Sequence, residues 1–156
     1  MASDGQGTIY VSSYGESSWS QDSDGNWIQS MSEPMGLYKI SGSSSSQVKD
    51  VHVSCMTLAD NTIYAIGNLA EMAGGFDNTL YKVSNNGGSV TAVSLSKTDA
   101  SAVGNPYGIL VNPDNGDIYI ADADYTGPGK VWCFTSDLKK KWVAVAGMLP
   151  AHMVLY

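Results

Sequence analysis

Four residues with oxygen-bearing side chains have the spacing of ligands in a calcium-binding loop. They take positions one, three, five and twelve of such a loop: Asp22, Asp24, Asn26 and Glu33. Trp27 stands where that loop needs glycine for its sharp turn, and no helical pattern flanks the segment. A protruding hairpin with its turn at residues 22–25 is therefore the preferred interpretation, and calcium is the alternative.

No catalytic constellation is visible in the sequence. The two histidines, His52 and His152, lie far apart, and neither a Gly-x-Ser-x-Gly motif nor zinc-type Cys/His spacing occurs. His152 stands where a channel-lining strand is expected to begin, so it is a candidate for the mouth of a channel, although a packed or solvated histidine is favoured. We predict no catalytic residue, no cofactor and no metal apart from the calcium alternative.

Aromatic side chains gather in the segments expected to form long connections between strands, at residues 14–35, 67–78, 96–107 and 122–129. Long loops on a scaffold of short turns are where binding usually resides. Exposed Trp and Tyr suit sugars, planar cofactors or protein partners. With His152, the candidate ligand-binding residues are Tyr14, Trp19, Trp27, Phe76, Tyr107 and Tyr125. The alternative is that each aromatic only packs its own loop.

The elements that would position these residues repeat along the chain. An Ile-Tyr pair recurs in three apolar strands, at 7–11, 61–65 and 116–120, with its isoleucine at residues 9, 63 and 118. A Leu-Tyr-Lys or Val-Trp-Cys strand follows each copy, at 36–41, 79–84 and 130–135. A further strand is predicted after each of these, at 48–53, 90–95 and 142–146.

The best-defined copy lies at residues 105–124, where two apolar strands flank the turn residues of 112–116. Related first strands are predicted at 54–60 and 150–156. Four antiparallel strands in units of about 50 residues are the signature of β-propeller blades. We therefore predict an all-β β-propeller with about three blades, and a β-sandwich is the alternative.

The predicted blades occupy residues 7–53, 54–95 and 106–146, and residues 152–156 are expected to close the first blade. Three blades are fewer than the usual four to eight. Either the chain is the C-terminal part of a longer propeller, or a homodimer completes a six-bladed ring by exchanging closing strands. The fragment is the preferred interpretation.

Composition excludes some partners. A net charge of −7, with residues 139–141 as the only basic run, argues against nucleic acid. No apolar stretch approaches the roughly 20 residues of a transmembrane helix, and no signal peptide is recognisable at the start.

Cys55 and Cys133 fall in different repeats, and two buried free thiols are favoured over a disulfide.

The final repeat resembles a known family. The Pro-Tyr-Gly-Ile start, the Asn-Gly-Asp-Ile-Tyr-Ile hairpin and the terminal Pro-Ala-His are similar to the last blade of the YncE-like propellers of Bacteroidetes, and specifically of the DUF5074 domain family. The similarity is good over residues 105–156 and only architectural before them. Family members are longer and carry a lipoprotein signal that this chain lacks.

The resemblance implies an exported binding protein at the outer-membrane surface or in the periplasm. Some relatives bind cobalamin and work with a TonB-dependent transporter, so a corrinoid is one ligand that the resemblance suggests. We expect a non-catalytic module that binds a small molecule, a glycan or an outer-membrane protein partner through its loop-rich face. The alternatives are a propeller-type hydrolase or lyase and a purely structural assembly role.

Overall fold

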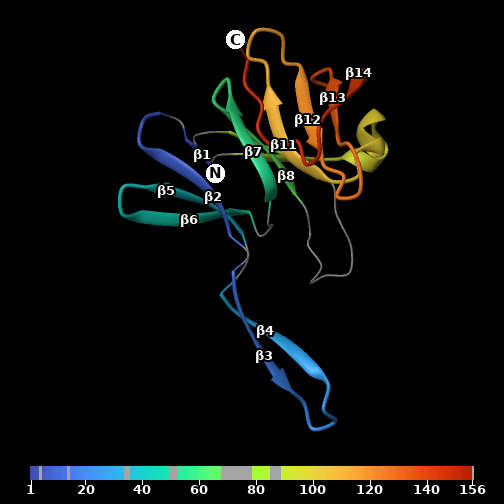
Figure 1. The fold of residues 1–156 in the computed structure, drawn as a ribbon. Helices are drawn as coiled ribbons and strands as arrows, with labels where there is room; N and C mark the ends of the chain where they lie inside the picture. Colours follow the sequence, from blue (N-terminus) through green and yellow to red (C-terminus); the bar gives the residue numbers. More distant parts are fainter. Residues whose placement is uncertain are drawn as a thin grey trace.

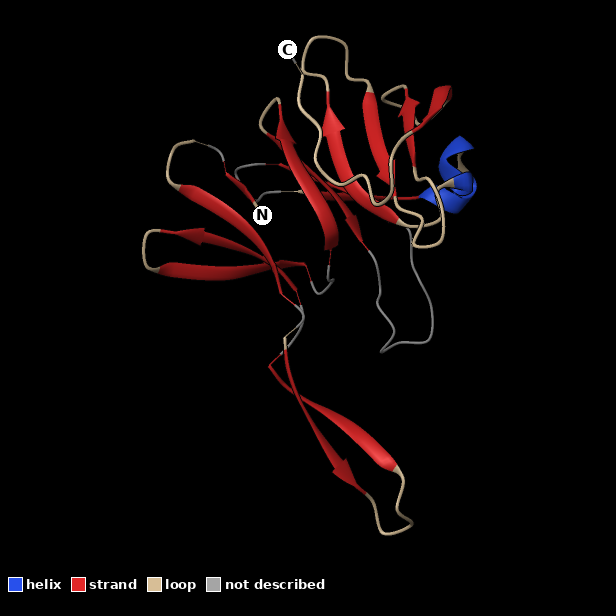
Figure 2. Cartoon of the chain, viewed as in Figure 1, coloured by secondary structure: helices blue, strands red, loops and turns tan. Residues whose placement is uncertain are grey.

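The computed structural model describes residues 1–3, 5–13, 15–33, 36–49, 53–67, 79–84 and 89–155. Three four-stranded antiparallel sheets and one two-stranded hairpin make up almost all of its regular structure (Figure 2). The described residues also form two short 3-10 helices, η2 at Leu95–Lys97 and η3 at Asp99–Ala102. No helix in these ranges is long and apolar enough to cross a membrane.

The first sheet has the order β1-β2-β5-β6, with strands Ala2–Ser3, Thr8–Ser13, Gly36–Ser41 and Ser44–Lys49. Ser41 pairs with Ser44 across a two-residue turn that begins at Gly42, whose φ is 59°. Because this turn is so tight, the last strand starts at once in the serine-rich segment. The strand predicted at 48–53 therefore begins four residues earlier, because the serine-rich segment was read as a turn; residues 50–52 lie outside the described residues, and Val53 belongs to the second sheet.

The second sheet has the order β10-β9-β8-β7, with strands Val90–Ser94, Thr79–Ser84, Thr62–Gly67 and Val53–Ala59. Asp60 and Asn61 connect β7 to β8 with positive φ angles of 45° and 57°. Two consecutive positive φ angles define the hairpin turn that matches strand twist, and Asp and Asn tolerate them well.

The third sheet has the order β11-β12-β13-β14, with strands Pro106–Val111, Ile118–Asp122, Lys130–Phe134 and Lys140–Val145. The predicted turn at residues 112–116 connects β11 to β12, and the Asn112 side chain accepts a hydrogen bond from the Asp114 N–H at 2.9 Å. Beside it, the buried Asp117 carboxylate pairs with the Lys141 ammonium at 2.6 Å.

The three sheets are arranged as consecutive propeller blades (Figure 1). Their first strands, β1, β7 and β11, are neighbours: β7 contacts β1 on one side and β11 on the other. Each sheet then runs outward in chain order to its last strand. This arrangement confirms the predicted fold class, an all-β propeller architecture with three four-stranded blades.

In the second strand of each sheet, successive side chains point to opposite faces of the sheet. Residues at equivalent positions of the repeat point to the same face. The isoleucine face carries the equivalent residues Ile9, Ile63 and Ile118. The tyrosine face carries their neighbours Tyr10, Tyr64 and Tyr119. Tyr10 packs in one core cluster with Ile63, and Tyr64 packs against a second cluster that contains Ile118. The tyrosine face of each blade therefore packs on the isoleucine face of the next blade.

The C-terminal segment does not close the first sheet. We predicted that residues 152–156 would pair with β2, but in the described part of the chain Ala2–Ser3 pairs there instead, opposite Tyr10 and Ile9, and Tyr156 lies outside that part. Gly5 and Gly7, with positive φ angles, fold the N-terminal residues back onto β2. Residues 151–155 form no strand and run beside β11 (Figure 1).

Gly108 is the point at which the C-terminal segment rests on the third sheet. A Cβ atom at Gly108 would lie 1.9 Å from the Ala151 carbonyl oxygen and 2.9 Å from its carbon.

Replacing Gly108 by Ala is therefore expected to displace residues 150–155 and to lower the free energy of unfolding by about 1–3 kcal/mol. Urea unfolding and hydrogen exchange at these residues measure both effects. Gly147→Ala is the control, since its Cβ meets open space, and equal stability of the two variants would contradict this packing.

Both cysteines are free in the structure. Cys133 is buried in β13 and Cys55 is half-buried in β7. Desolvation raises the pKa of the Cys55 thiol to about 12 and also raises the pKa of Cys133. Both side chains therefore stay protonated near neutral pH and act as small apolar packing groups.

Candidate functional site

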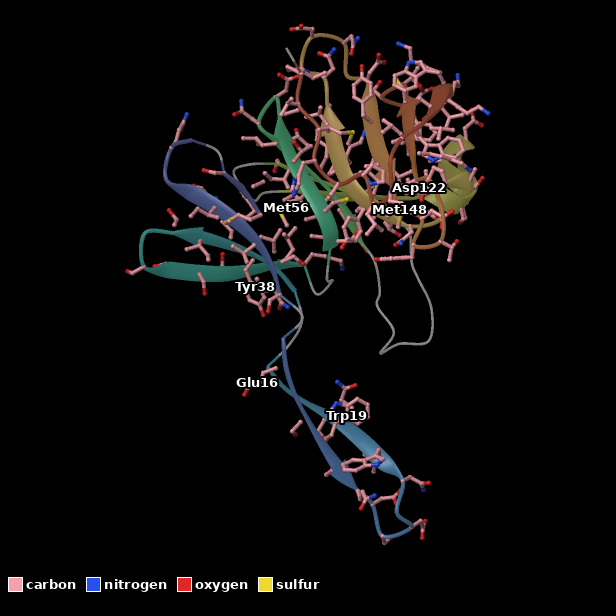
Figure 3. All side chains as sticks on the ribbon, viewed as in Figure 1. Glu16, Trp19, Tyr38, Met56, Asp122 and Met148 are labelled. Atoms are coloured by element: carbon pink, nitrogen blue, oxygen red, sulfur yellow. The ribbon has the colours of Figure 1, made fainter. Side chains whose placement is uncertain are left out.

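Two segments meet at one end of the third sheet. One is the connection between β12 and β13, and the other is the segment that leads into β11. Asp122, the last residue of β12, joins them: its Oδ1 accepts hydrogen bonds from the N–H groups of Gly104 and Asn105, at 3.2 and 2.7 Å. Its Oδ2 accepts from the Trp132 indole N–H at 3.0 Å. Asp122 is therefore a positioning residue that fixes two loops and one core indole (Figure 3).

Asp124 organises the loop that follows. Its Oδ1 accepts from the Thr126 N–H and hydroxyl, both at 2.8 Å, and from the Gly127 N–H at 3.2 Å. The backbone bond from Thr126 is the largest cause that lowers the pKa of Asp124, and Lys130 contributes electrostatically. All three donors reach the same oxygen, so Oδ2 is available to a ligand.

The lowered pKa of Asp124 predicts how this loop responds to acid. Because the folded-state pKa is depressed, the carboxylate stabilises the loop above the ordinary pKa of about 3.9 and loses that effect as pH falls through the lower folded value. We expect the amide resonances of Thr126 and Gly127 to stay constant from neutral pH down to about 4 and to shift below it. An NMR titration with Asp124→Asn as control measures this, and a transition above the ordinary pKa would contradict it.

Two exposed tyrosines border this loop. Tyr107 on β11 and Tyr125 in the β12–β13 connection have their ring centroids 6.5 Å apart, with an interplanar angle of 89°. They are 45% and 62% exposed, respectively. The edge-to-face contact holds the rings in place while a large part of each side chain stays exposed to water. A ligand ring can gain contact area here without reorganising the protein.

Tyr125 lines a hollow of about 470 Å³, and Tyr107 is connected to that hollow through its contact with Tyr125. The hollow is lined by the two loops that Asp122 joins and by the start of β13. Asp124, Tyr125 and Lys130 are among its lining residues, so an acidic, an aromatic and a basic residue border it. The Lys130 ammonium also lies 5.7 Å from the centre of the Trp132 ring. A ligand in such a hollow can meet a negatively charged hydrogen-bond acceptor, a positively charged donor and a flat apolar surface.

The structure separates the aromatic residues that the sequence analysis grouped. Trp19 and Trp27 lie on a hairpin of β3 (Glu16–Gln21) and β4 (Trp27–Glu33) that projects away from the three sheets (Figure 1). Trp19 and Asp122 are far apart in Figure 3. The hairpin was predicted as a protruding turn, but its tryptophans do not join Tyr107 and Tyr125 in one site.

The acidic residues of the hairpin turn serve the turn itself. Asp22 Oδ1 accepts hydrogen bonds from the Asp24 and Asn26 N–H groups, at 2.9 and 2.8 Å, and its Oδ2 accepts from the Asn26 amide at 3.1 Å. Glu33 pairs with Glu16 at the other end of the hairpin. The predicted calcium ligands are therefore not gathered in one place, and the described residues contain no group of three or more metal-ligating side chains.

The remaining predicted site residues are Tyr14, Phe76 and His152. Tyr14 and Phe76 lie outside the described residues. His152 is exposed in the C-terminal segment, next to the Ala151 that contacts Gly108. Asp122, Asp124 and Lys130 are not among the site residues predicted from the sequence. The sequence does contain a signal for this loop: the pattern Asp-Tyr-Thr-Gly at 124–127 is typical of a turn closed by an Asp side chain.

No protein-family model matches the chain, and no curated protein is similar to it. One solved structure, a quinonprotein alcohol dehydrogenase-like protein from Bacteroides thetaiotaomicron, has 15% sequence identity and a TM-score of 0.48. That match covers 83% of this chain and 33% of the other protein, so this chain spans about a third of its length. The YncE-like family remains a resemblance.

Proposed function

We propose that this chain is a non-catalytic binding module whose ligand occupies the hollow beside Tyr107 and Tyr125. The observation that carries the proposal is the exposed edge-to-face tyrosine pair, one member of which, Tyr125, lines a hollow together with Asp124 and Lys130. A neutral polyhydroxylated ligand, such as a sugar, fits this surface, because its C–H face packs on tyrosine and its hydroxyl groups bond to Asp124 and Lys130. The net charge of −7 disfavours polyanions.

The test is a titration with gluco-, manno- and xylo-oligosaccharides followed by calorimetry. Tyr125→Ala is expected to weaken binding at least about fivefold, because an aromatic contact is worth roughly 1 kcal/mol or more. Trp27→Ala is the matched control, since Trp27 is also a well-exposed aromatic residue but lies on the projecting hairpin. Loss of binding in the control and not in Tyr125→Ala would place the site on the hairpin.

The resemblance to YncE-like propellers supports two finer proposals. Export to the outer-membrane surface or periplasm is one, and a corrinoid ligand handed to a TonB-dependent transporter is the other. A spectral titration with cyanocobalamin tests the second directly. Binding of cyanocobalamin that depends on Tyr107 and Tyr125 would favour the corrinoid over the sugar.

A protein partner is a second candidate function, and the hairpin favours it. Trp19 pairs with Gln29 and Gln21 pairs with Trp27, so the two tryptophans lie two positions apart on one face of the hairpin. Both are exposed, as is Ile28 on the opposite face. Exposed tryptophans on a projecting arm are suited to anchoring in pockets of another protein. In that case Trp19→Ala and Trp27→Ala abolish partner capture and leave sugar binding unchanged.

A further inference from the structure

The outer edge of β14 is largely unpaired. This strand pairs with β13 and is the last in the strand order of its sheet, so no described strand bonds to its other side (Figure 1). In an antiparallel ladder, alternate residues direct their N–H and C=O groups away from the neighbouring strand. A strand edge that presents such groups can pair with a further strand.

Hydrogen bonds at the two ends of β14 determine which of its backbone groups point outward. At one end, the Thr135 N–H donates to the Lys139 carbonyl oxygen at 2.9 Å. At the other end, the Ala146 N–H donates to the Gly129 carbonyl oxygen at 2.8 Å. Lys139 and Ala146 therefore direct their bonding groups toward β13. The outward groups follow by alternation from each end, and a bulge between the two ends takes up one extra residue.

The residues of β14 with outward backbone groups are Lys140, Val143 and Val145. An acceptor already approaches this edge at one of them, because the Asp99 Oδ2 atom accepts a hydrogen bond from the Lys140 N–H at 2.9 Å. Among the described residues, no acceptor bonds to the N–H groups of Val143 and Val145. These two valines are two positions apart, which is the spacing at which an added antiparallel strand forms its hydrogen-bonded pairs.

The same two valines present apolar side chains along the edge. Val143 is 44% exposed and Val145 is 75% exposed. Cross-strand partners share a face of the sheet, so both valines lie on the face of Trp132, which packs in the cluster between the second and third blades. Their exposure therefore comes from their place on the outermost strand of this sheet, and a blade on the opposite face would not cover them.

Two lysines flank the valines on the same face, although the chain as a whole is acidic. Lys130 is the cross-strand partner of Val145, and Lys140 is the partner of Phe134 near the other end of β14. Both lysines are exposed. The chain has a net charge of −7, and its only basic run is residues 139–141. The edge of β14 is therefore the part of the third sheet that best suits an acidic partner.

We propose that the outer edge of β14 binds an extended acidic segment of another protein, which adds to the third sheet as a fifth strand. The backbone of the segment bonds to Val143 and Val145, its apolar side chains lie beside these valines, and its acidic side chains reach the two flanking lysines. A second copy of this chain suits the edge less well, because it brings together two molecules of net charge −7. Val143 and Val145 do not line the hollow, so the inference is independent of the sugar site.

The probe is a fluorescently labelled, capped peptide with the sequence Glu-Thr-Val-Thr-Val-Thr-Glu, followed by anisotropy. It is expected to bind the wild-type chain with a dissociation constant of about 1 mM or lower. N-methylation of both valines removes the peptide N–H groups that face β14 and should abolish binding. N-methylation of the two outer threonines, whose N–H groups face away, should preserve it. Replacing both glutamates by lysine should weaken binding, and so should added salt.

Val145→Pro tests the edge on the protein side. Proline is tolerated on an edge strand where its nitrogen faces outward, so the bonds to β13 should remain. Peptide binding is expected to weaken at least about fivefold, because one outward N–H is lost. Val90→Pro is the matched control: Val90 is an exposed valine of the outer strand β10, and it points its N–H outward because the adjacent Ser89 carbonyl oxygen accepts from the Ser84 N–H. This control should bind the peptide like the wild-type chain.

The N-methylated peptides act on the wild-type chain and therefore keep the test valid if the proline variant does not fold. No binding of the unmodified peptide at about 1 mM, equal binding of the two N-methylated peptides, or equal effects of the two proline variants would overturn the proposal. Sedimentation equilibrium that shows a wild-type dimer dissociated by Val145→Pro would overturn it in favour of a second copy of this chain.

Discussion

Replacing Ile118 by Ala is expected to lower the free energy of unfolding by about 2–5 kcal/mol. Ile118 is fully buried in the cluster between the second and third blades, opposite Phe134 in the neighbouring strand. Because well-packed interiors relax only partly around a deleted side chain, the substitution loses both apolar burial and the contacts around the resulting cavity. Urea unfolding measures the change.

The repeat makes this prediction specific. Ile63 takes the equivalent position between the first and second blades and is also fully buried, so Ile63→Ala should cost a similar amount. Val90→Ala, on an exposed outer strand, should change stability by less than about 0.5 kcal/mol. If Ile118→Ala were as mild as Val90→Ala, interblade packing would not hold the three sheets together.

Replacing Asp122 by Ala is expected to lower the free energy of unfolding by about 2–3 kcal/mol, because a hydrogen bond to a charged group contributes roughly 1.5–3 kcal/mol and the three bonds are not additive. The substitution leaves the N–H groups of Gly104, Asn105 and Trp132 without their acceptor. It also frees the two loops that form the hollow, so sugar binding should fall with stability.

Asp122→Asn separates the hydrogen bonds to the two backbone N–H groups from the hydrogen bond to the Trp132 indole. Its amide oxygen can still accept from Gly104 and Asn105, but its NH2 group then meets the donor N–H of Trp132. An intermediate loss is expected, together with a change in the near-ultraviolet circular dichroism of Trp132. Asp114→Ala, on the turn at the other end of the sheet, is the control and should be neutral. Equal stability of all three variants would remove Asp122 from its positioning role.

The repeat made the blades predictable, because strands with one buried face leave a period-two pattern in the residues. The strands at 36–41 and 79–84 lie where the Leu-Tyr-Lys pattern placed them. The start of the strand at 44–49 was missed because its residues are mostly serine and their pairing comes from the Gly42 turn, not from apolar alternation. The position of β1 was also missed, since two residues of backbone pairing leave no side-chain pattern.

The candidate site was predictable only in part. Tyr107 and Tyr125 were predicted as site residues because exposed aromatic residues in long loops often form binding sites. The structure brings these two residues together. Trp19 and Trp27 were selected for the same reason but belong to the projecting hairpin, and loop length alone does not reveal how far a connection extends. Asp122 was missed because its role depends on donors 17 and 18 residues away in the chain.

The most direct test of the binding site is amide chemical-shift mapping of the wild-type chain during a titration with the oligosaccharides named above. Shifts are expected at residues 102–107 and 122–130, and these shifts should be lost in Tyr125→Ala. Shifts confined to the turn at 112–116 or to the hairpin at 16–33, or no shifts with any of these sugars, would contradict the proposed sugar site.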